Sequence, residues 1–399
     1  MSTLSVVQPA LLSKINEREV LRTIQARGPL SRAEVARHSG ISAPTASKAV
    51  EALLRAGLLE EGDAELARGR PAKKLRLASE TAQVLGLVID AEQCRIVSAG
   101  LDGKLHEKRI FEFPTPATYE ELIETAYTQA QRLMNRAGVT TLGMAISIPG
   151  LIDYQHYRSL LSPNVPLTNQ HTPGQDLAER LGIACILIQE THALCLAERH
   201  FGNARNLNDF AMMDVTTGIG LGVMSGGRLL TGHSGLAGEI GHIIVELDGR
   251  LCGCGNRGCL ETVASDSAFV WRLSQRLGRK LHIEEALILL RQGEPAASEA
   301  LAQTSRYLAV GLAAVINLFN PSTLFIHNRL FAADETLFSR LIEETRRHAL
   351  SPSFAQCHIV QARGSKRQGA VAAIIEHLTN AFVPALVTDA RPHTLGGKR

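Results

Sequence analysis

The most informative part of this 399-residue chain consists of Gly238-Glu239-Ile240-Gly241-His242 and, after nine intervening residues, Cys252-Gly-Cys254-Gly-Asn-Arg-Gly-Cys259-Leu-Glu261. One His and three of the seven Cys thus fall within 18 residues, separated by glycines that let a loop wrap an ion. Four such ligands close a tetrahedral Zn²⁺ site and leave no position for water, which is typical of structural zinc. The sequence predicts this site at His242, Cys252, Cys254 and Cys259. The alternative is a group of buried free thiols beside an unrelated His.

The composition limits the class of protein further. Hydrophobic residues make up 45% of the chain and charged residues 20%, so a mostly disordered or fibrous protein is excluded. There is no run of 18 apolar residues and no signal-peptide pattern, so we expect a cytoplasmic protein that does not contact the membrane. In a reducing compartment, clustered cysteines indicate a metal rather than disulfides.

The first 80 residues have the pattern of three helices and a hairpin. Apolar spacing predicts helices over 14–26, 31–38 and 42–57; Ser31 begins a capping-box pattern, and Ser42 is a candidate cap for the third helix. Two strands then flank a basic loop. Short helices joined by a glycine turn and followed by a hairpin predict a winged helix-turn-helix domain over residues 1–80, whose third helix enters a DNA major groove.

The charge distribution supports DNA binding by this head. Residues 1–80 carry 13 Lys and Arg against 9 Asp and Glu, whereas the other 319 residues carry 29 against 30. The candidate DNA contacts lie on the exposed face of the third helix and on the wing: Ser42, Pro44, Thr45, Ser47, Lys48, Arg68, Arg70, Lys73 and Lys74. The alternatives are a structural three-helix subdomain with a solvated basic loop, and a module that binds another protein.

Beyond residue 80 the pattern changes to apolar strands alternating with helices. Strand hairpins and helices recur in two similar halves, which predicts an α/β body over residues 81–385 with two lobes, about 81–200 and 201–385, and a cleft between them. The tail 386–399 is expected to be disordered.

Three segments carry a resemblance to a known family. Thr217-Gly218-Ile219-Gly220-Leu221-Gly222, the Gly-Glu-x-Gly-His segment and the three-cysteine segment occur in the order and spacing of the ROK family, which contains repressors and sugar kinases. With the helix-turn-helix in front, the chain resembles the regulator branch of sugar-responsive repressors. The resemblance implies an actin-like, two-lobed, sugar-kinase-type (ribonuclease H-like) α/β body, a structural zinc at the same four residues, and assembly into a homodimer or homotetramer.

The resemblance also implies a sugar site. In ROK sugar kinases the Glu and His of Gly-Glu-x-Gly-His and the Glu two residues after the last Cys contact sugar hydroxyls; here these are Glu239, His242 and Glu261. Asn164 stands where relatives place a sugar-contacting Asn, although an ordinary Asx turn explains it equally well. Carboxylates accept paired hydrogen bonds from vicinal hydroxyls, and a loop tied by a metal would hold them rigidly.

Three of the four elements that ROK kinases need are altered. Where the kinases have Asp-x-Gly-Gly-Thr, this chain has Asp90-Ala91-Glu92-Gln93-Cys94, which offers phosphate no glycine backbone and adds a negative charge. The catalytic Asp, eight residues before Glu198, is replaced by Glu190, whose extra methylene displaces the carboxylate. His327-Asn328-Arg329 replaces a glycine-rich adenosine loop. We therefore expect no catalytic residue, and we expect Glu190 to contribute to ligand binding instead.

Together these patterns predict a sequence-specific regulator, a repressor of carbohydrate-metabolism genes. It would bind a double-stranded DNA operator through its head, and its zinc-stabilised body would sense a sugar or sugar derivative without phosphorylating it. The alternative is an active ATP-dependent sugar kinase with a fused DNA-binding domain.

Overall fold

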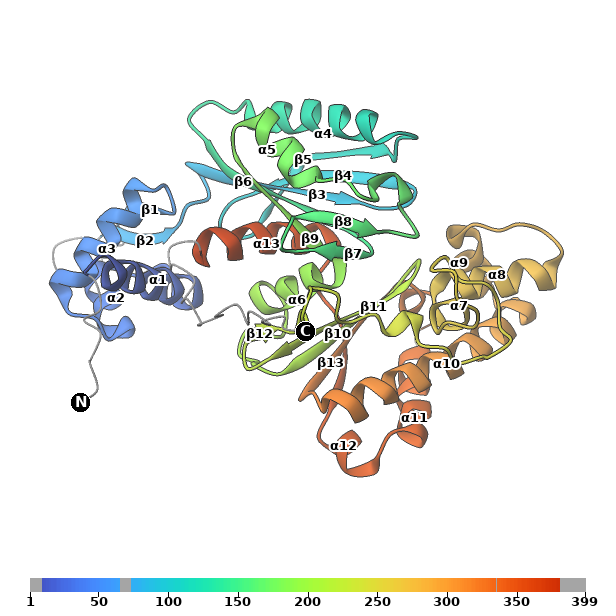
Figure 1. Cartoon of the computed structure of the whole chain (residues 1–399). Helices are drawn as coiled ribbons and strands as arrows, with labels where there is room; N and C mark the ends of the chain where they lie inside the picture. The colour runs from blue at the N-terminus through green and yellow to red at the C-terminus, as the bar shows by residue number, and fades with distance from the viewer. Residues whose placement is uncertain (1–8, 65–72, 335, 381–399) are drawn as a thin grey trace, which may run out of the picture.

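The computed structural model describes residues 9–64, 73–334 and 336–380 and shows a small N-terminal head beside a larger body (Figure 1). The predicted wing residues Arg68 and Arg70 and the tail 386–399 lie outside the described residues. None of the helices in the described ranges combines the length and the apolar character needed to cross a membrane.

The head has the predicted three helices and hairpin. Its elements are α1 (Pro9–Arg27), α2 (Arg32–Ser39), α3 (Ala43–Arg55), β1 (Leu59–Ala64) and β2 (Lys73–Leu77). Ser31 forms a capping box with Glu34, and Gly40 ends α2 in the left-handed conformation, as the sequence predicted. Ser42 precedes α3, but its hydroxyl pairs with that of Thr45 at 2.8 Å and does not cap the helix backbone.

The first lobe is a five-stranded sheet in the order β5-β4-β3-β6-β9. Its strands are β3 (Ala82–Ile89), β4 (Gln93–Ala99), β5 (Leu105–Pro114), β6 (Thr140–Ile148) and β9 (Ala184–Gln189). β3 runs antiparallel to β4 and parallel to β6, which in turn runs parallel to β9. The outer face is covered by α4 (Tyr119–Met134) and α5 (Pro173–Leu181), and the short elements β7 (Leu151–Asp153), β8 (Arg158–Leu161) and η1 (Pro166–Thr168) follow β6.

The second lobe repeats this plan with the order β12-β11-β10-β13-β14. The strands are β10 (Phe210–Val215), β11 (Ile219–Ser225), β12 (Arg228–Leu229), β13 (Thr323–Asn328) and β14 (His358–Gln361). The other elements of this lobe are η2 (Ile240–His242), α7 (Glu261–Ala264), α8 (Asp266–Leu277), α9 (Ile283–Arg291), α10 (Pro295–Phe319), η3 (Leu330–Ala332), α11 (Leu337–His348) and α12 (Ser351–Ala355). They form its outer layer (Figure 1).

Two helices lie between the sheets. α6 (Glu190–His200) packs on β10 and β11 of the second sheet, and α13 (Lys366–Asn380) packs on β3 and β6 of the first sheet and on α6. Apolar side chains of both sheets and both helices form one continuous core there. The predicted division of the body at about residue 200 assigned α13 to the second lobe. In the structure, this last helix packs on the sheet of the first lobe.

Candidate functional site

The four predicted metal ligands meet in the loops between β12 and α7. The ligand atoms of His242, Cys252, Cys254 and Cys259 all lie within 4.8 Å of one another. Cys254 Sγ is 3.7 Å from Cys259 Sγ, and His242 Nδ1 is 3.6 Å from Cys252 Sγ. Two sulfurs that each lie about 2.3 Å from one tetrahedral ion are about 3.8 Å apart. We call this set the metal cluster; its spacing suits one metal ion held by all four side chains.

Two glycines allow the Gly-Glu-Ile-Gly-His segment to lie directly against β11. Gly238 has a φ of 103°, and a Cβ at this position would lie 2.1 Å from the carbonyl oxygen of Leu221. A Cβ on Gly241 would lie 2.1 Å from the carbonyl oxygen of Ile219. Any larger residue would push this segment off the strand, so the glycines fix the places of the Glu and His beside them.

The five predicted ligand-binding residues line one small cavity between the lobes, and they are Asn164, Glu190, Glu239, His242 and Glu261. Gly218 faces two of them, because a Cβ there would lie 2.9 Å from the Glu261 carboxylate and 3.3 Å from the Asn164 amide nitrogen. The volume of this small cavity is about 60 Å³, which is room for only a few water molecules.

His242 connects the metal cluster to the small cavity. Its Nδ1 faces Cys252, while its Nε2 lies 3.6 Å from Glu239 Oε2. The Cys252 thiol donates to Glu261 Oε1 at 2.9 Å. Burial raises the pKa of Glu239, and the Glu261 carboxylate adds to the effect while His242 opposes it. The metal cluster and these two carboxylates therefore form one connected unit.

A buried lysine that the sequence analysis did not identify lies next to the small cavity. Lys366 begins α13, and its Nζ contacts Glu190 Oε1 and lies 3.3 Å from Asp90 Oδ2 and 3.7 Å from Asp214 Oδ2. We call these four residues the Lys366 cluster. Asp90 follows β3, Glu190 begins α6, and Asp214 belongs to β10. The cluster therefore ties together both sheets and both central helices.

Burial and charge set the protonation of the Lys366 cluster. Burial raises the pKa of Glu190 to about 7; Lys366 opposes this shift, and the carboxylates Asp214 and Asp90 add to it. Desolvation by itself would lower the pKa of Lys366, but the three carboxylates raise it above its usual value, so the amine stays charged. A metal ion that bridged these carboxylates would have to occupy the space of the Lys366 ammonium group.

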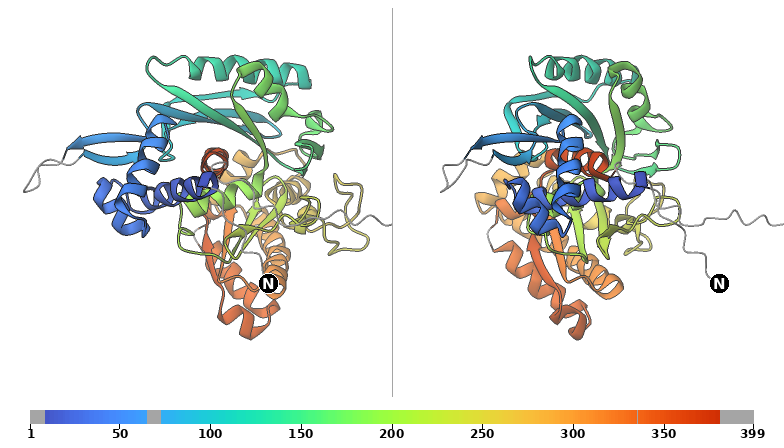
Figure 2. Two further views of the ribbon diagram at one scale, coloured as in Figure 1. Left: turned by 60° about the vertical axis from the view of Figure 1, so that its left-hand side comes forward. Right: turned by 90° about the vertical axis from the view of Figure 1, so that its left-hand side faces the viewer.

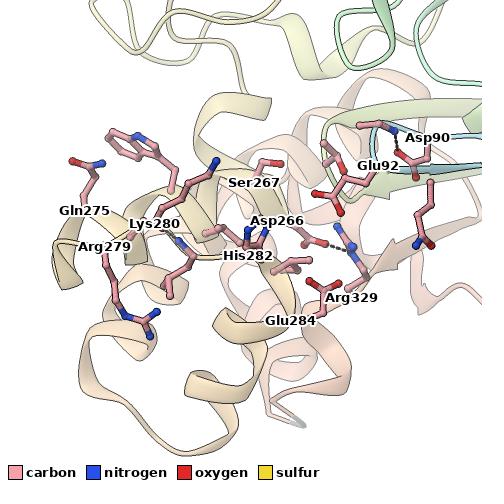
Figure 3. Close-up of a pocket in the computed structure, with 18 of the residues that line it drawn as sticks. Asp90, Glu92, Asp266, Ser267, Gln275, Arg279, Lys280, His282, Glu284 and Arg329 are labelled. Carbon is pink, nitrogen blue, oxygen red and sulfur yellow. Dashed lines mark hydrogen bonds and ion pairs between the residues drawn. The ribbon is translucent and has the colours of Figure 1, made fainter. Parts of the chain in front are cut away.

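A larger cavity of about 970 Å³ adjoins the Lys366 cluster, because Asp90 and Thr217 line both this cavity and the small one (Figure 3). In its wall, Arg329 Nε donates to Asp266 Oδ2 at 3.0 Å, and Asn328 Nδ2 donates to Asp266 Oδ1 at 3.1 Å. Burial raises the pKa of Asp266 to about 6, against the effect of Arg329. Asn328 and Arg329 thus both bind Asp266, the first residue of α8.

The candidate DNA contacts of α3 lie at its N-terminal end. Ser42, Pro44 and Lys48 are exposed, and Thr45 and Ser47 are half-buried. The opposite face of α3 packs into the core of the head through Ala49, Val50 and Leu53. Small exposed side chains at the start of such a helix permit a close approach to base edges.

The base of the wing carries the remaining described candidates, Lys73 and Lys74. Lys73 Nζ lies 2.8 Å from Glu61 Oε2, so this predicted DNA contact has an acidic partner in the free head. Arg32 lies 3.5 Å from the same carboxylate and donates to Ser47 Oγ at 3.5 Å. Sequence reasoning missed Arg32, because only the fold places the start of α2 between α3 and the hairpin.

Both the head and the body match known protein families. The model of the ROK family matches residues 84–377, and a winged helix-turn-helix DNA-binding model matches residues 14–60. The chain is 27% identical to the DNA-binding transcriptional dual regulator NagC of Escherichia coli, over 94% of this chain and 95% of that protein. It is 25% identical to the xylose repressor of Bacillus subtilis, over 86% of this chain and 89% of the repressor.

Solved structures show the same relationship. A ROK family transcriptional regulator described as a homologue of the E. coli MLC protein superposes with a TM-score of 0.80 at 25% identity, over 93% of this chain and 98% of its own. A ROK family glucokinase from Streptomyces griseus, 24% identical, shares the fold with a TM-score of 0.66 over 73% of this chain and 97% of its own. The chain therefore belongs to the ROK family and carries a winged helix-turn-helix DNA-binding domain in front of the family domain.

Proposed function

We propose that this protein is a sugar-responsive transcriptional repressor. Its head binds operator DNA in the cytoplasm, its body binds a sugar or sugar derivative, and the bound sugar changes the affinity of the head for DNA. One observation carries this proposal: a single chain joins the exposed start of α3 to a body whose small cavity is lined by Glu239, His242 and Glu261. The relatives named as NagC and as a xylose repressor support the same function.

In the proposed sugar site, the carboxylates of Glu239 and Glu261 accept hydrogen bonds from neighbouring hydroxyls, and the Asn164 amide can both donate and accept. The small cavity of about 60 Å³ is too small for a sugar in this conformation, so binding requires the two lobes to separate. A ligand that binds the open form more tightly shifts the protein toward that form. This opening would carry the signal.

For the metal cluster we propose structural zinc. One imidazole and three thiols form a donor set that Zn²⁺ favours, and their spacing is that of a tetrahedral site. Zinc supplies a cross-link there and no reaction step. It would hold the segment with Glu239 and His242 against the segment with Glu261, so that loss of the ion would disorder the sugar site.

We further propose that the body does not phosphorylate its ligand. Glu190, at the position of the catalytic base, contacts the Lys366 ammonium group, which also fills the space between Asp90 and Asp214. Arg329 adds a charged side chain to the wall of the large cavity. The alternative, an ATP-dependent sugar kinase with a fused DNA-binding domain, is favoured by the size of that cavity, about 970 Å³.

Incubation with ATP and a set of hexoses separates these two functions. Product formation that disappears in Glu190→Ala would establish the kinase and contradict the repressor proposal in its non-catalytic form. A thermal-shift screen with sugars and sugar phosphates tests the sensor directly, because any ligand that binds only the folded state raises the unfolding midpoint. The midpoint shift should be lost in Glu239→Gln and kept in Glu284→Gln, which alters an exposed glutamate of the large cavity.

Footprinting upstream of the protein's own operon tests DNA binding. The double variant Lys48→Ala/Arg70→Ala should weaken the footprint at least tenfold, which corresponds to about 1.4 kcal/mol or more. The matched control, Arg27→Ala/Arg55→Ala, removes two positive charges from other positions in the head and should bind almost normally. An unchanged footprint in the first variant would instead support a head that binds protein.

We also propose that the protein acts as a homodimer or homotetramer. Helix-turn-helix domains read two half-sites when they are paired by symmetry. Leu247 and Leu251, on the metal-bearing loop, are 87% and 64% exposed in the single chain, and such apolar side chains suit a contact between subunits. Sedimentation of the zinc-loaded protein tests this, since a monomer at micromolar concentration would contradict it.

A further inference from the structure

The head and the body enclose a cavity of about 860 Å³ that the proposed function does not use. On the head side its walls are α1 and the end of β2. On the body side they are the turn 101–104, the C-terminal end of α6 and the C-terminal part of α13. Figure 2 shows α1 between the rest of the head and the central helices, and α1 contacts α13 directly. We call this space the junction cavity.

Basic side chains dominate the lining of the junction cavity. Two acidic residues, Asp102 and Glu376, face six long cationic ones: Arg18, Arg22, Arg76, Lys104, Arg199 and Arg205. Both sides of the junction contribute, since the first three belong to the head and the last three to the body.

Some of these cations are neutralised within the protein. Arg76 pairs with Glu60 at 2.9 Å and with Glu80 at 2.5 Å, both in or next to the hairpin. Lys104 lies 3.5 Å from Asp102 in the neighbouring turn. The excess of positive charge is therefore carried by the four other arginines.

Those four arginines, Arg18, Arg22, Arg199 and Arg205, have no carboxylate within 4.0 Å in the part of the chain that the structure describes. Arg18 Nε is buried and makes no hydrogen bond to a described residue. Arg199 bonds only to neutral groups there, the Gly227 carbonyl at 2.6 Å and the Met224 sulfur at 3.6 Å. Ion pairs with described residues thus do not neutralise these four guanidinium groups, although Glu376 lines the same cavity.

Arg18 lies near two other cations of this lining. Burial lowers the pKa of Arg18, and the charges of Arg22 and Arg199 lower it further, while Glu376 partly offsets them. Arg18 and Arg22 lie one turn apart on α1, so they present their side chains on the same face. Arg199 reaches the same space from α6. An anion placed among them would relieve this repulsion.

We propose that the junction cavity binds a small anion with at least two phosphate groups. Guanidinium groups bind phosphate oxygens in pairs, and the arginines of the head and of the body are attached to different domains, so one ligand would need anionic groups for both. A cavity of about 860 Å³ has room for a molecule of nucleotide size.

Two helices connect this cavity to the proposed sugar site. α6 begins at Glu190 and α13 begins at Lys366, both in the Lys366 cluster, and both helices end at the junction cavity. There His200 Nδ1 accepts a hydrogen bond from Gln25 Nε2 of α1 at 2.8 Å, and His200 Nε2 donates one to Glu376 Oε2 of α13 at 2.8 Å. At 1.5 Å per residue, the two ends of α6 are roughly 15 Å apart.

This connection gives the bound anion a consequence for regulation, which rests on the proposed DNA-binding function. The anion would hold α1 against the ends of α6 and α13 and so fix the orientation of the head. Since the other ends of the same helices line the small cavity, sugar binding and anion binding would each change the affinity for the other.

Calorimetric titration of the full-length, zinc-loaded protein with inorganic pyrophosphate, at constant ionic strength and without DNA, tests the site itself. We expect saturable binding that weakens at least tenfold in Arg18→Gln/Arg22→Gln and also in Arg205→Gln, an exposed position on the body side. Arg27→Gln, an exposed charge of α1 outside the cavity, should bind as the unaltered protein does. Removal of zinc by pyrophosphate would affect all four proteins alike, so it cannot imitate this pattern.

Absence of pyrophosphate binding to the unaltered protein, or equal weakening in Arg27→Gln, would overturn the proposal. A second arm measures binding to DNA from upstream of the protein's own operon, with and without pyrophosphate. An effect of pyrophosphate on the DNA dissociation constant that is absent in Arg18→Gln/Arg22→Gln supports the regulatory part. Loss of DNA binding in that variant, without pyrophosphate binding in any protein, would assign the arginines to DNA and overturn the anion site. Failure of the DNA arm alone would overturn only the regulatory part.

Discussion

The metal cluster and the Lys366 cluster each gather four side chains around one centre, but the chain assembles them differently. The metal ligands come from 18 consecutive residues on one glycine-rich loop system. The Lys366 cluster joins residues as far apart as Asp90 and Lys366, from both sheets and both central helices. The first centre is local and lies within one loop system, whereas the second is formed only when the lobes and the last helix have assembled.

The two centres also differ in how they are stabilised. An ion bound by four protein ligands contributes its binding energy directly to folding. A buried ammonium group among carboxylates must first offset the cost of removing every charge from water, so its net contribution to stability is small although removal of one partner is costly. Variants at the two centres should therefore differ in size of effect and in pH dependence.

The largest effect is expected at the metal cluster. Cys254→Ser should abolish binding of the metal and lower the free energy of unfolding by more than about 5 kcal/mol, because loss of one ligand opens the whole site. Elemental analysis and the thermal midpoint measure this. Cys357→Ser, a free cysteine outside the cluster, is the control and should retain the metal. Full stability of Cys254→Ser, or absence of zinc in the unaltered protein, would contradict the proposal that the metal cluster holds structural zinc.

The next effect concerns Lys366. Lys366→Met leaves Asp90, Glu190 and Asp214 without their shared cation, and we expect a loss of about 3–5 kcal/mol in the free energy of unfolding at neutral pH. Chemical denaturation measures it. Lys280→Met, in the wall of the large cavity, removes an exposed lysine and should be almost neutral. If both variants are equally stable, the Lys366 cluster is not a structural centre.

The pH dependence separates the two centres further. The pKa of Glu190 is about 7 in the folded protein, against an ordinary value near 4.5 in the unfolded chain. The stabilisation from its bound proton is complete below pH 4.5 and is lost as the pH rises through 7. Stability should therefore fall across this window, by up to about 3 kcal/mol from this group. Glu190→Gln should flatten the fall, and an identical pH profile in this variant would contradict the assignment.

For this measurement Glu284→Gln serves as the control, since it alters an exposed glutamate of the large cavity. It should leave the pH profile unchanged. Both variants keep Asp266, whose raised pKa of about 6 produces a fall of the same direction, so only the difference between them reports on Glu190.

The smallest effect compares two serines that have similar sequence contexts. Ser31 caps α2 through the backbone of Glu34, whereas the hydroxyl of Ser42 pairs with that of Thr45. Ser31→Ala should cost about 1 kcal/mol of head stability, and Ser42→Ala much less. Urea unfolding of the two variants measures the difference. Equal losses would mean that Ser42 caps α3 as the sequence alone predicted.

The parts of the molecule that were predicted from the sequence are those that depend on neighbours along the chain. The helices of the head follow from capping residues, glycine stops and apolar spacing. The metal ligands follow from Cys and His separated by short glycine turns. The position of Arg32, in contrast, could not be predicted from the sequence, because its place between α3 and the hairpin depends on how α2 packs.

Lys366 shows most clearly why the rest could not be predicted. Its neighbours Gly364, Ser365 and Arg367 indicate an ordinary polar helix start, yet its side chain is only 15% exposed. Burial of a lysine requires carboxylates that other elements supply. The residues next to Lys366 in the sequence do not indicate which carboxylates these are. The junction cavity has the same origin, since Arg18 and Arg199 belong to helices that meet only in the folded protein.

By itself, the sequence determined that this chain is a winged helix-turn-helix joined to a ROK domain whose loop carries one His and three Cys in metal-ligand spacing, because each of these rests on residue types at short, fixed spacings. Only the tertiary structure decided which charges face one another. Parallel strands and a returning last helix bring residues hundreds of positions apart into contact, and electrostatic interactions depend on distance in space, not on distance along the chain.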